Sequence, residues 1–495
     1  MSMNAMNWLV VYPEIVLLAM ACVVAVVDLW VTDPARRLTF WLTQASILVV
    51  GAMHLVHAQS GVTLYGMNGM VVTDPMGHLL GFFACVAMLV TVAYAQPYLA
   101  SRDMLKGEYF TLSMFVLLGI SVMCSANHFL VVYLGLEVMS LSLYALTALR
   151  RDHARSTEAA MKYFVLGALA SGFLLYGMSM LYGATGSLEI PKVFEQIAAG
   201  RINHDVLVLG VVFMVSGLAF KLGAVPFHMW VPDVYQGAPT AVTLMIGGAP
   251  KLAAFAITIR LLVEGLLGMA VDWQQMLIVL AVGSLAVGNL AAIAQSNLKR
   301  MLAYSTIAQM GFLLLGLSAG VVSGNTLSAA NAYSSAMFYI VTYVLTTLGT
   351  FGLILFLSRE GFESEELSDL AGLARRRPWL AGVMSIFMFS LAGIPPMVGF
   401  FAKLAVIQAL VTTNVILYIV LAVVAVVFSL IGAFYYLRVV KVMYFDEPTD
   451  TTPVIQGQGL GALLAVNGAA VLLLGPFSGG LLGLCRDAII KTLAT

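Results

Sequence analysis

Long apolar stretches, separated by short polar connections, run through the whole chain. A helix that crosses the hydrocarbon core of a bilayer needs about 20 mostly apolar residues. Fourteen stretches meet this requirement, at approximately 8–28, 39–58, 75–96, 108–124, 128–149, 160–182, 205–231, 239–263, 275–295, 301–320, 331–357, 379–411, 414–443 and 458–484. The connections are too short to hold other domains, so the pattern predicts an all-α polytopic membrane protein with about fourteen transmembrane helices.

The seventh and twelfth stretches, 205–231 and 379–411, are unusually long and contain or adjoin prolines. These are Pro226 and Pro232 in the first case, and Pro395 and Pro396 in the second. A proline inside a helix removes a backbone donor and frees carbonyl groups, which at membrane depth must face protein or water. We therefore predict that helices 7 and 12 are broken at an ion site, although a kink with only a packing role is the alternative.

The order of the breaks predicts an internal repeat. Spans four to eight and spans nine to thirteen each contain five helices, and each set has its broken helix in fourth place. Because five is odd, consecutive sets must cross the membrane in opposite directions, as in the inverted repeats of many transporters. We expect an N-terminal three-helix segment at 1–107, five-helix units at 108–267 and 268–443, and a C-terminal helix at 444–495.

The composition agrees with a membrane protein and excludes several classes of function. Hydrophobic residues make up 61% of the chain and charged residues 10%, whereas soluble proteins carry about a quarter charged residues. A formal net charge of zero argues against a nucleic-acid partner. The four cysteines form no CxxC pair, so no metal site or iron–sulfur cluster is predicted. GQGLGA at 457–462 matches the dinucleotide fingerprint formally, but it lacks a βαβ setting, so no nucleotide or flavin site is predicted. Membrane lipids are the expected surroundings.

The positions of basic residues predict an orientation. Of the 24 lysines and arginines, fifteen fall in one set of loops and five in the other, Arg260 among the five. Since cytoplasmic loops carry the excess of positive charge, both termini are expected on the periplasmic side. Four basic residues remain inside spans, namely Lys162, Lys221, Lys251 and Lys403.

Three of these lysines, Lys221, Lys251 and Lys403, lie several turns from either end of their spans. A lysine at the centre of a membrane helix costs about 2.5–3.5 kcal/mol, unless its long side chain reaches the surface. An ammonium group removed from water releases its proton more readily, so we predict a proton relay. For Lys162, near a span end, an ordinary helix-surface pair with Glu158 is a competing interpretation.

Other polar residues extend this hypothesis. Glu137 is an acid well inside a span, where it either pairs with Lys221 or is neutral and hydrogen-bonded locally. His228 follows the first break and either extends the relay or is structural. Polar residues that hold water between the lysines or join helices are Tyr304, Ser305, Thr306, Gln309, Tyr339 and Tyr343. Histidines expected at the membrane interface are His54, His57, His78, His128 and His204.

Four motifs carry a resemblance to a known family: FKLGAVPFHMWVPDVYQGAPT, GGAPKLAAFA, SNLKRMLAYSTIAQMG and LAGIPPMVGFFAKL. They resemble the N-type antiporter-like membrane-arm subunits of bacterial respiratory complex I, NADH:quinone oxidoreductase, and the resemblance covers essentially the whole chain. It implies that Glu137 pairs with Lys221, that Lys251 bridges to Lys403 along a hydrated axis, and that Lys162 matches a further lysine of the family.

The resemblance also implies partners and location. NADH, FMN, iron–sulfur clusters and quinone would be bound by other subunits, with no cofactor in this chain. Neighbouring antiporter-like and small membrane-arm subunits would be its partners in the bacterial inner membrane. The predicted function is proton translocation coupled to NADH-to-quinone electron transfer. Three alternatives are a subunit of a multi-subunit cation/proton antiporter, a transporter of a small anionic metabolite, and a structural spacer.

Overall fold

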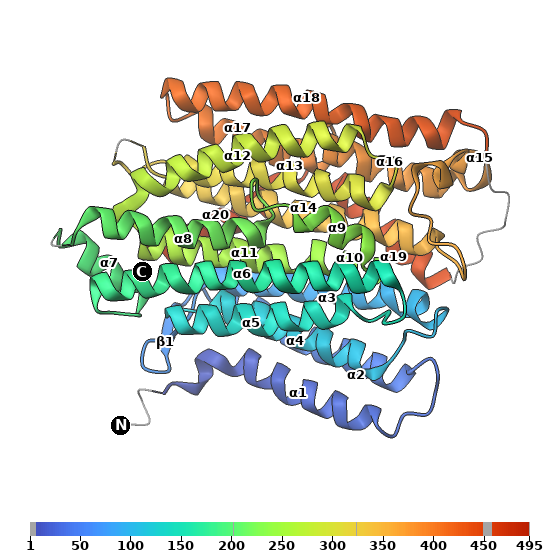
Figure 1. Cartoon of the computed structure of the whole chain (residues 1–495), viewed down its shortest axis with the longest axis horizontal. Coiled ribbons are helices and arrows are strands. Elements are labelled where there is room, and N and C mark those ends of the chain that lie inside the picture. The colour runs from blue at the N-terminus through green and yellow to red at the C-terminus, as the bar shows by residue number, and fades with distance from the viewer. Residues whose placement is uncertain (1–5, 201, 323, 449–457, 495) are drawn as a thin grey trace.

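A computed structural model describes residues 6–200, 202–322, 324–448 and 458–494 of the chain. Its helices lie side by side in one elongated bundle with their axes roughly parallel or antiparallel (Figure 1). In the described part, twelve helical segments are long and apolar enough to cross a membrane. The all-helical polytopic prediction is therefore confirmed, apart from a short antiparallel hairpin of β1 (Leu64–Gly66) and β2 (Val71–Thr73) in one loop.

The first half of the chain comprises α1 (Tyr12–Asp28), α2 (Arg37–Ser60), α3 (Pro75–Ala100), α4 (Gly107–Ser125), α5 (Phe129–Thr147), α6 (Ala154–Thr185), α7 (Ile190–Ala198), α8 (His204–Leu222), α9 (Trp230–Gly237), α10 (Thr240–Gly247) and α11 (Pro250–Thr258). A π-helix, Ile259–Gly265, continues α11. The second half comprises α12 (Ala270–Ile293), α13 (Leu298–Ser318), α14 (Ala329–Leu357), α15 (Leu373–Arg376), α16 (Pro378–Ala392), α17 (Val398–Val411), α18 (Ile416–Phe445), α19 (Gln458–Leu473) and α20 (Ser478–Leu493).

Both predicted breaks are present. The first stretch is α8 followed by α9, with Pro226 in the connection between them. Pro232, also expected to break the helix, instead lies in the first turn of α9, where a missing backbone N–H costs no helical hydrogen bond. The second is divided between α16 and α17, which have 15 and 14 residues and are joined through Pro395 and Pro396. The last predicted span differs, because α19 and α20 meet at an angle of 82° and together make at most one crossing. Pro476 lies in the bend, where its missing N–H ends the helical hydrogen-bonding pattern.

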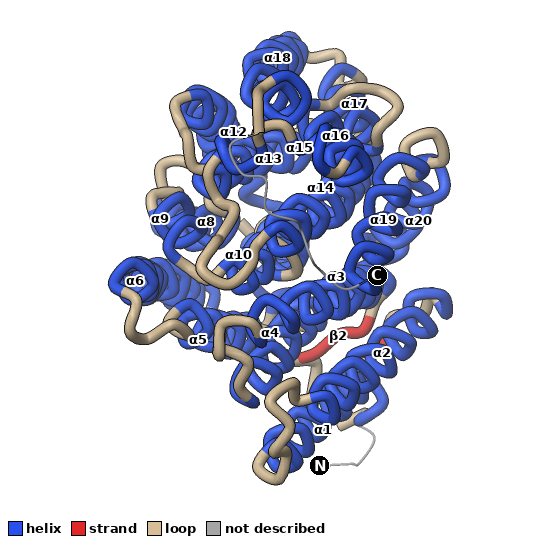
Figure 2. The backbone as a smooth tube through the Cα atoms, turned by 90° about the vertical axis from the view of Figure 1, so that its right-hand side faces the viewer, coloured by secondary structure: helices blue, strands red, loops and turns tan. Residues whose placement is uncertain are grey.

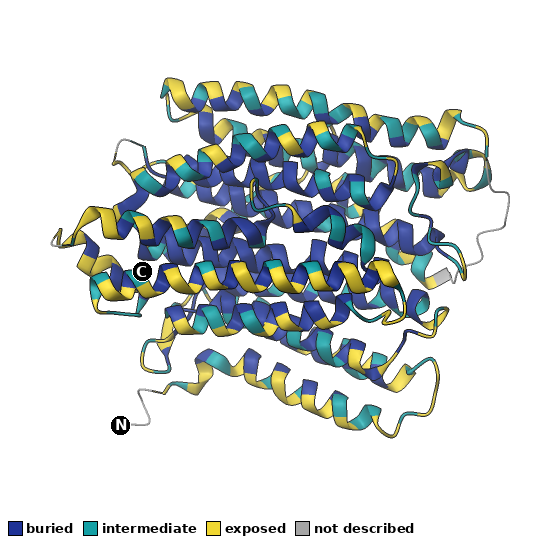
Figure 3. Ribbon diagram, in the orientation of Figure 1, coloured by how far each residue is buried: buried dark blue, intermediate teal, exposed yellow. Residues whose placement is uncertain are grey.

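The helices differ in how far the rest of the bundle buries them. Viewed from the end, α14 lies inside the bundle while α1, α6 and α18 lie at its rim (Figure 2). The segments around α11, α13 and α14 are almost entirely buried, whereas the rim helices expose much of their apolar surface (Figure 3). Exposed side chains such as Trp41 and Leu430 are what a lipid-facing surface requires. The interior helices are thus the ones that can hold polar groups away from both lipid and water.

The two ends of the bundle differ in the elements that they carry. The terminal face carries β1, α7 and the end of α20, at the left of Figure 1. The basic face lies at the opposite end and carries α15 and the arginines Arg102, Arg150 and Arg151.

Candidate functional site

The first break exposes the end of α8 to a buried lysine. Gly223 ends α8 with φ = 83°, a left-handed conformation that glycine adopts without steric cost. Lys251, on α11 and 1% exposed, donates hydrogen bonds from Nζ to the carbonyls of Lys221 and Leu222, at 3.2 and 2.9 Å. These are the last carbonyls of α8, where the helix dipole is negative. The break therefore supplies the partners that make a buried ammonium group tolerable.

The second break repeats this arrangement. Gly393 ends α16 with φ = 87°. Lys403 of α17, 7% exposed, donates from Nζ to the carbonyls of Leu391 and Ala392, at 2.9 and 3.0 Å. A third bond of 2.9 Å goes to the Ser429 hydroxyl on α18. Each broken helix thus ends at a glycine, and each helix end receives a lysine side chain.

Lys221 and Glu137 lie close along the same helix pair but are not joined. The Lys221 ammonium donates to the Ser140 hydroxyl of α5 at 2.9 Å. Among the described residues no ion pair connects Lys221 to Glu137, and Glu137 Oε1 has no hydrogen-bond partner. In this conformation the Lys221 ammonium therefore contacts Ser140 and not Glu137, and the pairing expected from the sequence stays a prediction. The reason is geometric, since Lys221 reaches the residue one turn further along α5.

A hydrogen-bonded set of polar side chains extends from Lys403 into α13 and α14. Gln309 donates to the same Leu391 carbonyl that Lys403 contacts, at 3.1 Å, and to the Tyr436 hydroxyl at 2.9 Å. Tyr339 donates to the Gln309 side-chain oxygen. Direct bonds of this kind join neighbouring helices. Beside Lys403 they leave a cavity of only about 20 Å³, close to the space of one or two water molecules.

Further members of the set are bonded in pairs. Ser305 pairs with Tyr436, and Tyr343 donates to Thr306 at 2.8 Å. Tyr304 lies at 6.0 Å from the Arg300 guanidinium, measured to the ring centre. These contacts show that many of the polar residues singled out from the sequence join helices directly.

Lys162 lies apart from the three buried lysines. It lines a cleft of about 270 Å³ at the basic face, with 41% of its side chain exposed. Its ammonium contacts Asp233 at 2.7 Å and Glu158 at 2.8 Å, and Asp233 also pairs with Arg300 at 2.7 Å. The helix-surface pair expected from the spacing is present, together with a second acid on α9.

Substitution of Lys162 is expected to have small effects. Lys162→Met should lower stability by about 0.2–1 kcal/mol, because exposed ion pairs contribute little and Asp233 keeps Arg300 as its partner. Proton pumping should fall less than twofold in the same variant, since water in the open cleft can take the place of the side chain. Thermal unfolding and dye-based pumping assays measure the two effects, and loss of pumping as severe as that of a buried-lysine variant would contradict the expectation.

His228 lies in the connection between α8 and α9. Its Nδ1 is buried and has no hydrogen-bond partner among the described residues. Among the described residues, the His228 ring makes no hydrogen bond to any of the four lysines. The structure thus brings His228 to the break without joining it to the relay.

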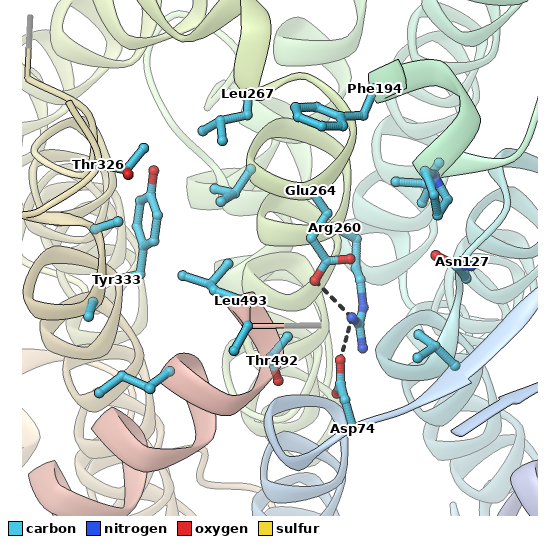
Figure 4. Close-up of a pocket in the computed structure, with 18 of the residues that line it drawn as sticks. Asp74, Asn127, Phe194, Arg260, Glu264, Leu267, Thr326, Tyr333, Thr492 and Leu493 are labelled. Carbon is cyan, nitrogen blue, oxygen red and sulfur yellow. Dashed lines mark hydrogen bonds and ion pairs between the residues drawn. The ribbon is translucent and has the colours of Figure 1, made fainter. Parts of the chain in front are cut away.

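Sequence reasoning missed a buried ionic cluster near the terminal face. Arg260, expected in a loop, is 1% exposed because it lies in the π-helix that continues α11. Its Nη1 contacts Asp74 at 2.5 Å and Glu264 at 2.8 Å (Figure 4). The signal in the sequence was the spacing of Arg260 and Glu264, four residues apart within an apolar run. The cluster lines a cavity of about 510 Å³.

His54 and His78, expected at the membrane interface, are buried within the protein. Their exposed fractions are 2% and 5%, and their rings are hydrogen-bonded to each other. Among the described residues, no group of three or more His, Cys, Asp or Glu side chains is placed to hold a metal ion.

The broken helices with their lysine-bound ends define a class of antiporter-like membrane subunits. The model of the protein family described as NADH:quinone oxidoreductase/Mrp antiporter, TM, matches residues 126–429, which include both breaks. NADH-quinone oxidoreductase subunit N of Polaromonas naphthalenivorans is 62% identical over 489 residues, 98% of each chain. The same subunit of Herminiimonas arsenicoxydans is 59% identical over the full length of both chains.

Solved structures of other membrane complexes contain chains with the same fold. A chain of respiratory complex I from Thermus thermophilus with bound aureothin superposes with a TM-score of 0.80 at 30% identity, covering 96% of this chain and all of that chain. A chain of the Mrp complex from Dietzia sp. gives a TM-score of 0.84 at 22% identity, which shows the shared fold alone. The chain belongs to the family of NADH-quinone oxidoreductase subunit N, and the resemblance carried by the motifs is confirmed.

Proposed function

We propose that the chain carries protons across the membrane through Lys221, Lys251 and Lys403, as one pumping subunit of complex I. The observation that carries this proposal is the placement of Lys251 and Lys403 on the carbonyl ends of the two broken helices. A helix end stabilises the charged lysine through its dipole, while burial favours the neutral amine. The two effects oppose each other, so a modest change nearby is enough to load or unload a proton.

Lys221, Lys251 and Lys403 together are called the lysine line, and Lys221 is its proposed control point. Its side chain contacts Ser140, and its backbone carbonyl accepts a hydrogen bond from Lys251. Glu137 lies three residues before Ser140 on α5, about 4.5 Å along the helix axis. Movement of the Lys221 ammonium group from Ser140 towards Glu137 would stabilise the positive charge of the lysine. The reverse movement would favour release of its proton. Lys221 therefore has two alternative partners on one helix.

The remaining expected residues have lesser roles in this proposal. Lys162, in the cleft at the basic face, passes protons from water towards the interior. His228 extends the proposed relay at the first break, where its buried Nδ1 can exchange a proton. The Gln309 and Tyr436 hydrogen bonds link the region of Lys403 to α18.

The proposed division into two inverted five-helix units, 108–267 and 268–443, has structural support. In both units a glycine with positive φ ends the helix before the break, and a proline follows three residues later, Pro226 and Pro396. The helix end binds a lysine in each unit. The similarity lies in the backbone and the ligating carbonyls rather than in the position of the lysine in the sequence.

The proposal includes the surroundings of the chain. Its partners would be the other complex I subunits, antiporter-like and small membrane-arm subunits in particular, with FMN, iron–sulfur clusters, NADH and quinone held elsewhere in the complex. The basic face would be cytoplasmic and both termini periplasmic, in the bacterial inner membrane. The exposed apolar side chains of α1 and α18 offer surface for lipid or for a neighbouring subunit.

The test compares two variants of the intact complex reconstituted in vesicles. Lys221→Ala and Glu137→Gln are expected to reduce pumping severalfold while the complex still assembles, because each removes one partner of the proposed switch. Protons pumped per NADH oxidised are measured with a pH-sensitive dye.

Glu108→Gln is the matched control, since Glu108 is an exposed acid on the neighbouring helix α4. It should pump like the wild type. Normal pumping in both Lys221→Ala and Glu137→Gln would overturn the proposed function.

A further inference from the structure

A pair of histidines is buried between α2, α3 and α4, away from the lysine line. Nδ1 of His54 and Nδ1 of His78 are 2.9 Å apart, and His54 Nε2 lies 3.2 Å from the Ser121 hydroxyl. A side chain at Gly81 would collide with the His54 ring, since an added Cβ would lie 2.8 Å from it. Close packing therefore holds the two rings against each other.

The Nδ1 contact requires a definite distribution of protons. One Nδ1 must carry hydrogen and the other must accept it, so each neutral ring keeps one proton. When His78 is the donor, its Nε2 is free to bind a further proton without loss of the bond to His54. His78 Nε2 is buried and has no partner among the described residues. The pair can thus gain one proton with its geometry unchanged.

A buried acid from a third helix completes the cluster. Glu14 of α1 is 8% exposed, accepts a hydrogen bond from Ser125 at 3.1 Å through Oε1, and has no partner for Oε2 among the described residues. Glu14 and both histidines line one small cavity of about 10 Å³, near the space needed for a single water molecule. A carboxylate and an imidazole on a common cavity can exchange a proton through water.

Asp74 connects this small cavity to the terminal face. Its side chain lines both the small cavity and the cavity of about 510 Å³, and it pairs with Arg260. In Figure 4 Arg260 lies between Asp74 and Glu264, and Phe194 and Leu267 lie on the Glu264 side of the cluster. Glu264, with 21% of its side chain exposed, is the more accessible acid of the cluster. Polar groups therefore continue from the large cavity to the histidine pair.

We propose that His54, His78 and Glu14 form a second proton-binding site, which exchanges protons with the cavity at the terminal face by way of Asp74. The site binds one proton at His78 Nε2, and the resulting imidazolium is balanced by the Glu14 carboxylate. This inference goes beyond the lysine line and does not depend on it, because none of the four lysines contributes to the cluster. Titratable and charged groups around the pair are His57 on α2, Asp74 immediately before α3, Cys85 on α3, Cys124 on α4, Arg260 and Glu264 on the π-helix, and Lys491 on α20.

The experiment uses the intact complex and begins with a measurement of proton uptake in the absence of NADH, so that no turnover takes place. Wild-type complex is titrated from about pH 8 down to the lowest pH at which the complex stays assembled, a range that extends well below the value of about 6.5 where free imidazole titrates, while infrared difference spectra follow 15N-labelled histidine. His54→Gln and His78→Gln are expected to take up about one proton fewer per complex. Glutamine keeps a hydrogen bond at each position but does not titrate in this range, so a purely structural role predicts no change.

His57→Gln is the matched control. Its ring stacks on His78 with centroids 4.9 Å apart, yet it is only half-buried and lies outside the small cavity. It is expected to retain the buried histidine signal. Uptake in His54→Gln and His78→Gln equal to that of the wild type would overturn the proposal.

Glu14→Gln provides an independent test, including the case in which the histidine variants do not assemble. Without the carboxylate counter-charge, the pair should protonate only at lower pH, and the infrared transition should shift in that direction. An unshifted transition would overturn the proposal. Lys221→Ala should leave this signal intact even where it abolishes pumping, which separates failure of this site from failure of the lysine line.

Discussion

Lys251→Met is expected to slow proton transfer through this subunit by about 10²-fold or more, because it removes the group that gives and takes the proton in the proposed relay. Methionine fills nearly the same space, so the nearly complete burial of residue 251 should be preserved. The carbonyls of Lys221 and Leu222 lose their shared donor, but they can still bind water at the break. The intact complex in vesicles should lose the share of pumping that this subunit carries.

Lys251→Arg separates charge from proton release. Arginine keeps a cation at the end of α8 but does not give up its proton in proteins. It is expected to assemble as well as the wild type and to pump as poorly as Lys251→Met. Lys441→Met, at an exposed lysine paired with Asp446 at the basic face, is the control and should pump normally. Full pumping by Lys251→Arg would show that only the positive charge matters.

Arg260→Met is expected to destabilise the subunit by about 3–5 kcal/mol, since removal of one partner leaves buried charge uncompensated. Asp74 is 1% exposed and would lose its ion pair, while Glu264 would lose its partner in the π-helix. The Cys124 carbonyl would also lose the hydrogen bond that ties α4 to this segment. Thermal unfolding of the purified complex, and its yield on native gels, measure the effect.

Arg486→Met serves as the comparison for that variant. Arg486 is exposed on α20 near the same face, and its loss should change stability by no more than about 0.5 kcal/mol. Equal unfolding temperatures for Arg260→Met and Arg486→Met would mean that the buried cluster contributes little to the fold.

The sequence was most informative where the membrane restricts what a chain can do. A helix in lipid must satisfy its backbone internally, so apolar length locates the spans and proline locates the breaks. For the same reason, Lys221, Lys251 and Lys403 could be recognised as unusual from their depth in the spans alone. The bend between α19 and α20 was missed because the apolar run continues through Pro476.

The sequence was less informative about which side chains contact one another and which are buried. Glu137 and Lys221 were expected to touch, yet the rotation of α5 against α8 brings Ser140 to the lysine. Burial of Arg260 depends on a π-helix, which sequence periodicity does not predict. His54 and His78 were expected at the membrane interface because they lie near span ends, and their burial within the protein depends on neighbouring helices such as α1 and α4.

The chain alone therefore established a polytopic membrane protein, the two breaks, and the set of lysines at depth, since these follow from local hydropathy and from the chemistry of proline. The tertiary structure decided which carbonyl or hydroxyl each ammonium group meets, and which polar residues near span ends are buried. Such contacts join helices that are distant in sequence, for instance Lys403 with Ser429 and Asp74 with Arg260. Their geometry is set by how the helices rotate and pack, which no local pattern encodes.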